Sequence, residues 1–242
     1  MRGRATRTRR ASSSLFVAPD GTGAPPPPGD AYLCSISRPG MLDLRVPLIL
    51  ASRSPRRRQL LERLQVRFSV HPSEVEEVVP PDIPPAHTVS LLARQKAEAV
   101  APGYPHALTL GADTVVVLDG AVLGKPSDDA EAAEMLARLG GRSHTVYTGI
   151  ALVHPESGRL VTAHEATEVT FAPLKPAEIE AYVLTGSPLD KAGGYGIQDD
   201  AGALFIEGLR GDYYNVVGLP LHRLYRTLHA HFADLLAPVG AR

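Results

Sequence analysis

From Met41 onward, the sequence alternates between short apolar runs with the spacing of a β-strand and longer segments with the spacing of an amphipathic α-helix. Strands are expected over residues 46–51, 66–72, 109–120, 143–154 and 159–172, and helices over 55–64, 88–101, 128–139, from Pro176 up to Gly186, and over 219–236. Some strands are joined by tight turns, as in a hairpin over 115–124, and others only through a helix. A chain with both kinds of connection favours a sheet of parallel and antiparallel strands. We therefore predict an α/β fold built on an elongated mixed β-sheet with flanking helices.

The long hairpin expected over 143–172 is predicted to project as a second lobe, which leaves a central cleft between two lobes. Ser127 is expected to cap the helix that follows it. Residues 188–202 are too rich in glycine to form a regular element, and residues 204–220 are expected to form a strand, a turn and a second strand. The nine histidines show no spacing typical of metal ligands, and we interpret them as surface residues.

Residues 1–40 differ in composition from the rest of the chain. They hold six basic and two acidic residues and a run of four prolines, a composition that cannot pack a core. The apolar stretch of a secretory signal is missing from them, and Met41 stands directly before the first strand-like run. We expect a disordered extension or sequence upstream of the true start, with a targeting peptide or a basic arm as alternatives, and one domain over residues 41–242.

The composition of residues 41–242 excludes several classes of protein. With 19 basic and 24 acidic residues, this part is mildly acidic and does not resemble a general nucleic-acid binder. The only cysteine is Cys34, so disulfides, a thiolate nucleophile and a cysteine-ligated zinc site are excluded from the domain. No apolar run approaches about 20 residues, so no membrane span is expected. The absence of disulfides favours a cytoplasmic location.

The segment LASRSPRRRQLL, residues 50–61, places three arginines in the first turn of a predicted helix. Because the helix dipole is already positive at that end, each cation there costs up to about 1 kcal/mol unless an anion offsets it. The free backbone N–H groups and the hydroxyls of Ser52 and Ser54 favour the same anion. We predict an anion site that uses Arg56 and Arg57, with a merely solvated basic face as the alternative.

A carboxylate and a lysine stand out in the run GADTVVVLDGAVLGKP, residues 111–126. Asp113 lies inside an apolar strand, where a carboxylate is uncommon unless it is paired or binds a metal. It is a candidate for taking a proton from water or for holding a metal, and a structural aspartate is the alternative. Lys125 is expected to point into the cleft near Asp113, unless it is an ordinary surface lysine.

Two further segments have side chains suited to a ligand. In DKAGGYGIQ, residues 190–198, the glycines let a backbone approach a ligand closely, and Gln198 offers a donor and an acceptor to the edge of a nucleobase. Glu74, Glu76 and Glu77, in an acidic and proline-rich segment, are candidates for a hard-metal site together with Asp113. A flexible loop and a solvated acidic run are the respective alternatives.

Together these segments resemble the Maf family of nucleoside triphosphate pyrophosphatases. The matching pieces are ASRSPRR at 51–57, GADTVVVLDGAVLGKP at 111–126, DKAGGYGIQ at 190–198 and GDYYNVVGLPL at 211–221. The resemblance covers residues 41–230 and implies a Maf/ITPase-like fold with a cleft between two lobes. It also implies a divalent metal, Mg²⁺ or Mn²⁺, and hydrolysis of a nucleoside triphosphate to the monophosphate and pyrophosphate. A homodimer rests on the resemblance alone.

The resemblance assigns roles to individual residues. Asp113 matches the catalytic aspartate, described in the family as the proton acceptor, and Glu77 matches an acidic position near the metal. The substrate-binding positions are matched by Ser52, Arg56, Arg57, Lys96 and Lys125, and the positions tied to base selection by Arg56, Thr114 and Gln198. Arg53 is a departure, because relatives often have a small residue there.

The form GYGIQ resembles the branch of the family that takes dTTP and UTP. A triphosphate carries about four negative charges, which the arginines, the lysines and a metal would neutralise while Asp113 activates water. We therefore expect a pyrophosphatase acting on dTTP and UTP, and on modified nucleotides of the same kind. The alternative is a nucleotide-binding regulator of cell division that does not turn the nucleotide over.

Overall fold

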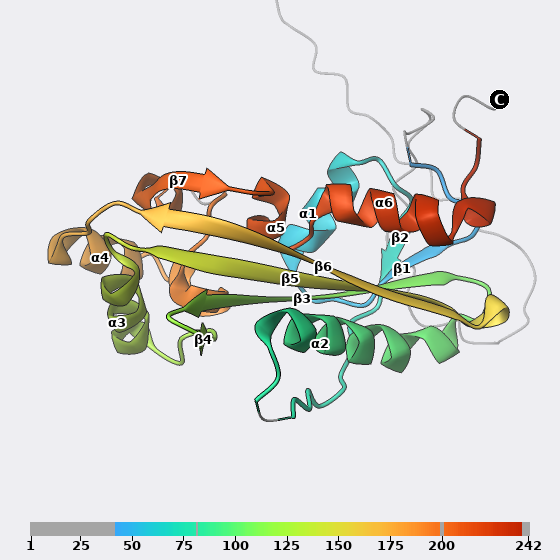
Figure 1. Cartoon of the computed structure of the whole chain (residues 1–242), viewed down its shortest axis with the longest axis horizontal. Helices are drawn as coiled ribbons and strands as arrows, with labels where there is room; N and C mark the ends of the chain where they lie inside the picture. The colour runs from blue at the N-terminus through green and yellow to red at the C-terminus, as the bar shows by residue number, and fades with distance from the viewer. Residues whose placement is uncertain (1–41, 81, 199–200, 239–242) are drawn as a thin grey trace, which may run out of the picture. The chain divides into compact units, whose positions relative to one another are not determined.

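The computed structural model describes residues 42–80, 82–198 and 201–238, so the expectation for residues 1–40 lies outside the described residues. The described chain forms one mixed sheet flanked by helices (Figure 1). The strands are β1 Leu48–Leu50, β2 Phe68–Val70, β3 Leu108–Leu118, β4 Ala121–Leu123, β5 Ser143–His154, β6 Arg159–Phe171 and β7 Ile206–Arg210. The α-helices are α1 Pro55–Arg63, α2 Pro85–Val100, α3 Asp129–Leu139, α4 Pro176–Val183, α5 Tyr213–Val217 and α6 Leu221–His231. The predicted α/β class is confirmed.

The seven strands follow the order β2-β1-β3-β5-β6-β7, and β4 pairs with β3 beside this path. β1 is parallel to both β2 and β3, since helices α1 and α2 carry the chain back between them. The other pairs are antiparallel. Short turns join β3 to β4 and β5 to β6, whereas longer segments with helices connect the partners in the pairs β3–β5 and β6–β7. β1 pairs with β3 as far as Leu110, and β4 pairs with β3 from Val116 onward. In the described chain, residues 111–115 therefore pair with β5 alone, and the other edge of β3 is open there.

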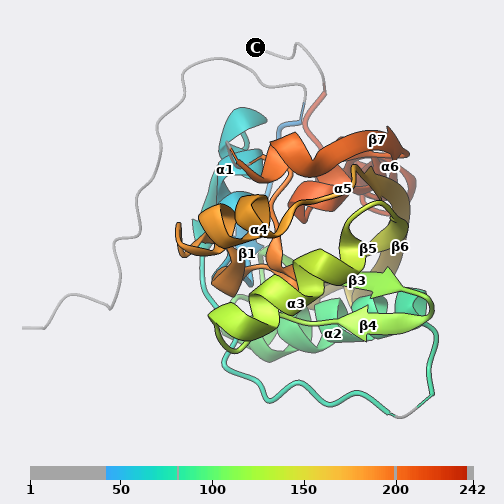
Figure 2. The same ribbon diagram turned by 90° about the vertical axis from the view of Figure 1, so that its left-hand side faces the viewer.

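Helix α2 packs on one face of the sheet, and α1 and α6 pack on the opposite face (Figures 1 and 2). The approach of α2 depends on two glycines of the sheet. A Cβ atom on Gly111 would lie 2.1 Å from the carbonyl oxygen of Ala93, and one on Gly149 would lie 2.3 Å from that of Val89. Gly149 is the register partner of Asp113 on β3. Because glycine has no side chain, α2 can lie close to the sheet beside Asp113.

The apolar side chains form two main clusters joined by the long strands β3, β5 and β6. One cluster gathers side chains from β1, α1 and α6 around the first part of β3. The other gathers side chains from α3, α4 and β4 around the last part of β3. The open edge of β3 at residues 111–115 lies between them. No helix in the described ranges is long and apolar enough to cross a membrane.

Two helix starts show what the local sequence determines. Ser54 caps α1, accepting a hydrogen bond at 3.5 Å from the Arg57 N–H, and Pro55 occupies the first helical position, as expected. The expected cap of α3 is wrong, because Asp128 takes that position and accepts from the Glu131 N–H at 2.8 Å. Ser127 instead donates its hydroxyl to the Glu131 carboxylate. A carboxylate one residue later competes better for the positive end of the helix.

The segment 204–220 does not form the expected strand, turn and strand. Its first half contains β7, but its second half forms the short helix α5. Asp212 caps this helix by accepting a hydrogen bond at 2.7 Å from the Tyr214 N–H, and Gly218 ends it in the left-handed region at φ 119°. The apolar and aromatic residues of α5 favoured a strand, but the two caps determine a helix.

The expectation that all histidines lie on the surface is wrong for His144 and His154, which are each 3% exposed. The His144 Nε2 atom lies 2.7 Å from the Tyr195 hydroxyl, and both rings pack edge-on against Phe171. Burial lowers the pKa of His144 to about 4. His144 stands in an alternating strand on the side that faces the second cluster, and this position rather than its polarity decides its burial.

We expect Gly149→Ala to lower the free energy of unfolding by about 1–3 kcal/mol, because the new methyl group would overlap the Val89 carbonyl and push α2 off the sheet. Denaturant unfolding followed by circular dichroism measures this. Gly103→Ala is the matched control, since nothing lies within 4 Å of its new Cβ. Equal stability of the two variants would contradict the tight seating of α2.

Stability should fall as the pH drops from about 6.5 to about 4. Over this range the unfolded chain binds a proton at His144 that the folded chain, with its lowered pKa, does not bind. The difference of about 2.5 pKa units corresponds to a loss of about 3 kcal/mol. The free energy of unfolding, measured at a series of pH values, should therefore depend less on pH in His144→Phe than in the wild type. The exposed control His222→Gln should keep the wild-type slope, and an unchanged slope in His144→Phe would contradict the assignment.

Candidate active site

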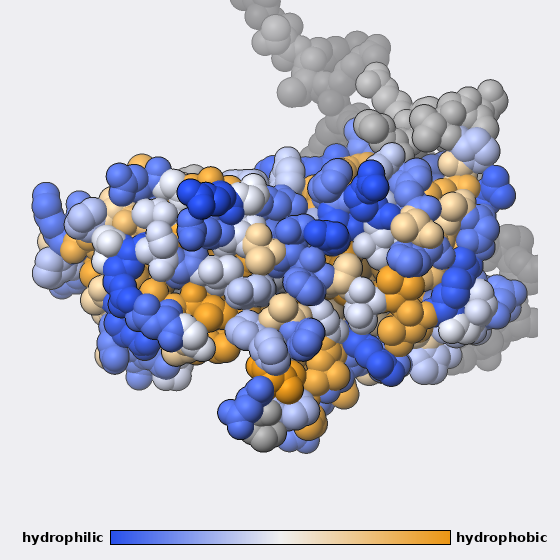
Figure 3. All heavy atoms as spheres, in the orientation of Figure 1, coloured by the Kyte–Doolittle hydropathy of each residue, from blue (hydrophilic) through white to orange (hydrophobic). Residues whose placement is uncertain are grey.

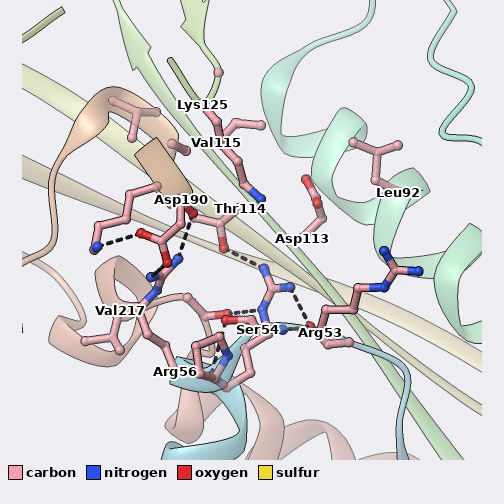
Figure 4. A pocket seen from close by; sticks show the side chains of 18 of the residues that line it. Arg53, Ser54, Arg56, Leu92, Asp113, Thr114, Val115, Lys125, Asp190 and Val217 are labelled. Atoms are coloured by element: carbon pink, nitrogen blue, oxygen red, sulfur yellow. Dashed lines mark hydrogen bonds and ion pairs between the residues drawn. The ribbon is translucent and has the colours of Figure 1, made fainter. Parts of the chain in front are cut away.

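A polar cavity of about 840 Å³ lies at the open edge of β3 (Figure 4). It is bounded by the turn before α1, the segment after β2, helix α2, the β4 turn, the glycine-rich segment 190–198 and the end of α5. The predicted site residues that line it are Ser52, Arg56, Arg57, Glu74, Glu77, Lys96, Asp113, Thr114, Lys125 and Gln198, whereas the metal candidate Glu76 does not line it. The sequence motifs thus converge on one place, the expected cleft.

Arg57 forms the floor of the cavity and is 8% exposed. Its Nε donates to the Gly218 carbonyl at 2.8 Å, Nη1 to the Ser52 hydroxyl at 3.1 Å and Nη2 to the Thr114 hydroxyl at 3.0 Å. Burial lowers the pKa of Arg57, and the nearby carboxylate of Asp113 acts in the opposite direction. The guanidinium therefore ties three separate segments together, and two of its five N–H groups remain for a ligand.

Arg56 follows in sequence but has a different partner. Its Nη1 donates to the Asp190 carboxylate at 2.8 Å and its Nη2 to the Asp190 carbonyl at 3.2 Å. Lys191, which is 8% exposed, donates to the same carboxylate at 2.6 Å. Burial by itself would raise the pKa of Asp190, but the hydrogen bonds from Lys191 and Arg56 outweigh it and lower the pKa. The sequence indicated Asp190 and Lys191 only as part of a glycine-rich segment suited to approach a ligand, without a role for either side chain.

The catalytic candidate Asp113 lies on the face of β3 that α2 covers. Lys96 of α2 reaches it, with Nζ 2.6 Å from the Asp113 carboxylate and 2.8 Å from the Glu77 carboxylate. Asp113 is 13% exposed and Glu77 is 48% exposed. The lysine thus holds two carboxylates from different segments at one point of the cavity. The sequence predicted all three residues, although nothing in their spacing predicts this contact.

Two other predicted residues differ in their surroundings. Lys125 extends into the cavity from the turn after β4 (Figure 4), and within the described residues no carboxylate pairs with it. Gln198 lines the cavity at its other side, close to Arg56. The position of Lys125 agrees with the expectation that it points toward Asp113.

A buried polar network behind the cavity was not foreseen from the sequence. The Thr114 hydroxyl lies 3.0 Å from that of Thr148, which donates to the Asn215 carbonyl at 2.8 Å. The Asn215 amide in turn donates to the Thr167 hydroxyl at 2.9 Å. Asn215 is fully buried within the short helix α5. An amide among apolar neighbours in the segment YYNVVG was the available signal.

The pair Glu77 and Asp113 fits a divalent metal. Both carboxylates converge on the Lys96 ammonium, so the cavity already holds two hard oxygen ligands around one cation. Mg²⁺ commonly uses one or two carboxylates and takes its other ligands from phosphate and water. Among the described residues there is no group of three His, Cys, Asp or Glu side chains that could hold a metal without such additional ligands.

A family model described as "Maf-like protein" matches residues 47–231. The chain is 58% identical over 201 residues to a protein named "dTTP/UTP pyrophosphatase" from Salinibacter ruber, covering 83% of this chain and 98% of the relative. It is 58% identical over 188 residues to a protein of the same name from Moorella thermoacetica, covering 78% and 96%. Among solved structures, a HAM1 protein from Coxiella burnetii aligns with a TM-score of 0.38 at 20% identity, covering 53% of this chain and 74% of that one.

We expect Thr114→Val to lower the free energy of unfolding by about 1–3 kcal/mol. The valine is similar in shape, but it leaves an N–H group of the buried Arg57 and the Thr148 hydroxyl without their shared partner. Thermal or denaturant unfolding without nucleotide measures the loss. Thr162→Val, at an exposed position of β6, is the control and should be nearly neutral. A neutral Thr114→Val would show that the network does not stabilise the fold.

Proposed function

The chain belongs to the Maf family, and we propose from this premise that it hydrolyses dTTP and UTP to the nucleoside monophosphate and pyrophosphate. The observation that carries the proposal is the charge of the cavity. Its lining holds six arginines and lysines against four carboxylates, a formal excess of two positive charges in a domain that is negative as a whole. A cavity of this kind suits a polyphosphate.

We place the triphosphate over the turn before α1. Arg56 and Arg57 stand at the start of that helix, where the backbone dipole also favours an anion. Lys125 approaches from the opposite wall and has no competing partner in the described chain. Ser52 acts through Arg57, since its hydroxyl accepts from Nη1 of that residue. Of these cations, Arg57 and Lys125 would stabilise the charge that builds up on the leaving pyrophosphate.

Asp113 is the proposed proton acceptor. Lys96 holds one carboxylate oxygen through its ammonium group, which orients the side chain and leaves the second oxygen for a water molecule. The water oxygen forms a bond to the α-phosphorus while the bond from that phosphorus to the bridging oxygen breaks. The proton of the water passes to Asp113, and pyrophosphate leaves as one unit.

Glu77 and Asp113 would hold the divalent metal that the family uses, Mg²⁺ or Mn²⁺. When bound, such an ion supplies Lewis-acid stabilisation of phosphate charge. Lys96 lies against both carboxylates, so its positive charge also keeps the two acids together before the ion arrives.

Base selection is proposed for the side of the cavity that holds Arg56 and Gln198. The Gln198 amide can donate and accept at the edge of a pyrimidine. Asp190 fixes the Arg56 fork by two hydrogen bonds, so the arginine presents a defined surface to the base. Thr114 contributes through its bond to Arg57.

The remaining parts of the proposal concern location and assembly. We propose a cytoplasmic enzyme, since residues 41–242 contain no cysteine and so no disulfide. The homodimer implied by the family resemblance can be tested on the full chain by light scattering coupled to size-exclusion chromatography.

The decisive experiment is a hydrolysis panel with dTTP, UTP, CTP, GTP, 7-methyl-GTP and ATP in Mg²⁺ or Mn²⁺, with pyrophosphate and orthophosphate measured separately. We expect pyrophosphate from dTTP and UTP. Asp113→Asn should lower kcat at least about 100-fold, because the amide cannot accept the proton. Asp119→Asn is the control, since Asp119 lies on the exposed turn after β3 and pairs with Arg142.

Three results would contradict parts of this proposal. Orthophosphate as the first product would exclude attack at the α-phosphorus. An active Asp113→Asn variant would remove the role of Asp113. Tight binding of dTTP without turnover by the wild type would favour the alternative, a regulator that senses the nucleotide.

A further inference from the structure

The four arginines around the start of α1 differ in how firmly the protein holds them. Arg57 is buried and makes three hydrogen bonds, and Arg56, 20% exposed, makes two to Asp190. Arg58 points along the outer face of the helix to Glu62 and does not line the cavity. Arg53 lines the cavity, and its side chain is 70% exposed. Of these four, Arg53 is thus the most exposed cation at the cavity.

The partner of Arg53 is Glu74, in the segment between β2 and α2. A single contact of 3.2 Å joins Arg53 Nη2 to Glu74 Oε1, and the Glu74 side chain is 86% exposed. Exposed pairs of this kind contribute about 0–1 kcal/mol. A phosphate accepts a bidentate arginine contact and carries more charge than a carboxylate. A polyphosphate should therefore displace Glu74 from Arg53 at little cost.

The segment that carries Glu74 is held at other points. It extends away from the sheet beside α2 and presents both apolar and hydrophilic residues (Figures 1 and 3). The Gln95 side chain donates to the Val78 carbonyl at 2.7 Å and accepts from the Val78 N–H at 3.2 Å. Glu77 is held by Lys96. If Arg53 releases Glu74, the Glu77 carboxylate therefore stays in place.

The position of Arg53 indicates which part of a nucleotide it would meet. In Figure 4, Arg53 lies on one side of Asp113 and Thr114, and Arg56 with Asp190 lies on the other. With the base on the side of Arg56 and the α-phosphate at Asp113, the chain of phosphates extends toward Arg53.

We propose that Arg53 is a further substrate-binding residue, which contacts the β- and γ-phosphates, and that Glu74 occupies it while the cavity is empty. This inference rests on the proposed function, because it uses the same orientation of the triphosphate. It makes Glu74 an internal competitor of the substrate. Removal of the arginine and removal of the glutamate must then change substrate affinity in opposite directions.

The test compares Arg53→Gln, Glu74→Gln and the double variant in steady-state hydrolysis of dTTP. Arg53→Gln should raise KM about tenfold with kcat little changed, since the lost contact lies away from the attacked phosphorus. Glu74→Gln should lower KM about two- to fivefold. The double variant should behave like Arg53→Gln, because without the arginine there is no site for Glu74 to block.

Product inhibition separates a phosphate contact from a general loss of structure. In Arg53→Gln, inhibition by pyrophosphate should weaken about tenfold, whereas inhibition by dTMP should stay as in the wild type. Arg53→Lys should restore part of the affinity for pyrophosphate, because it keeps the charge but not the fork. Equal weakening of both inhibitors would overturn the assignment to the β- and γ-phosphates.

The controls are Arg58→Gln and Glu62→Gln. Arg58 and Glu62 form a neighbouring ion pair of the same chemistry, and neither residue lines the cavity. These variants should keep the wild-type KM. If Glu74→Gln raises KM or leaves it unchanged while the wild type releases pyrophosphate from dTTP, the inference fails and the proposed function stands. If the wild type releases no pyrophosphate and binds neither inhibitor, the proposed function itself has failed.

Discussion

The arrangement of the cavity depends on one buried cation. A guanidinium at 8% exposure is tolerated only because hydroxyls and a carbonyl receive its N–H groups, and those acceptors come from three distant parts of the chain. Arg57 therefore fixes the turn before α1 against β3 and against the end of α5. The positive field at the floor of the cavity is part of the folded structure before any substrate arrives. The residue that stabilises the arginine-rich turn is therefore the same residue that places a positive charge in the cavity.

The second constraint is the close contact between α2 and the sheet. Glycines at 111 and 149 leave no side chains between the helix and β3, and the next residue on that face of the strand is Asp113. Lys96 of α2 then reaches the Asp113 carboxylate, with Nζ 2.6 Å from Oδ1. The ion pair of Lys96 and Asp113 is thus a product of backbone packing. A looser contact would leave Asp113 facing solvent, without the cation that orients it.

The local sequence predicted the residues of the site but not the contacts between them. Arg56 and Arg57 at a helix start and Asp113 inside an apolar strand violate local rules, and all three line the cavity. The helix α5 was missed because Asp212 and Gly218 cap a segment whose residues favour a strand. Likewise, the burial of His144 depends on which face of β5 meets the second cluster. Register, burial and cross-sheet partners are properties of the assembled chain, and the pattern of a single segment does not contain them.

The charges of the cavity explain why so many ion pairs occupy a binding site. In the absence of a nucleotide, six cations in one cavity would repel each other, and four carboxylates reduce that repulsion. The carboxylates differ in how firmly they are held: Asp190 receives two cations, Asp113 one, and the exposed Glu74 a single long contact. The weakest pair is the one a polyphosphate can exchange most readily. A divalent ion would raise the formal excess from two to four, about the charge of a nucleoside triphosphate, so under the proposed function the ion and the triphosphate together would make the site neutral.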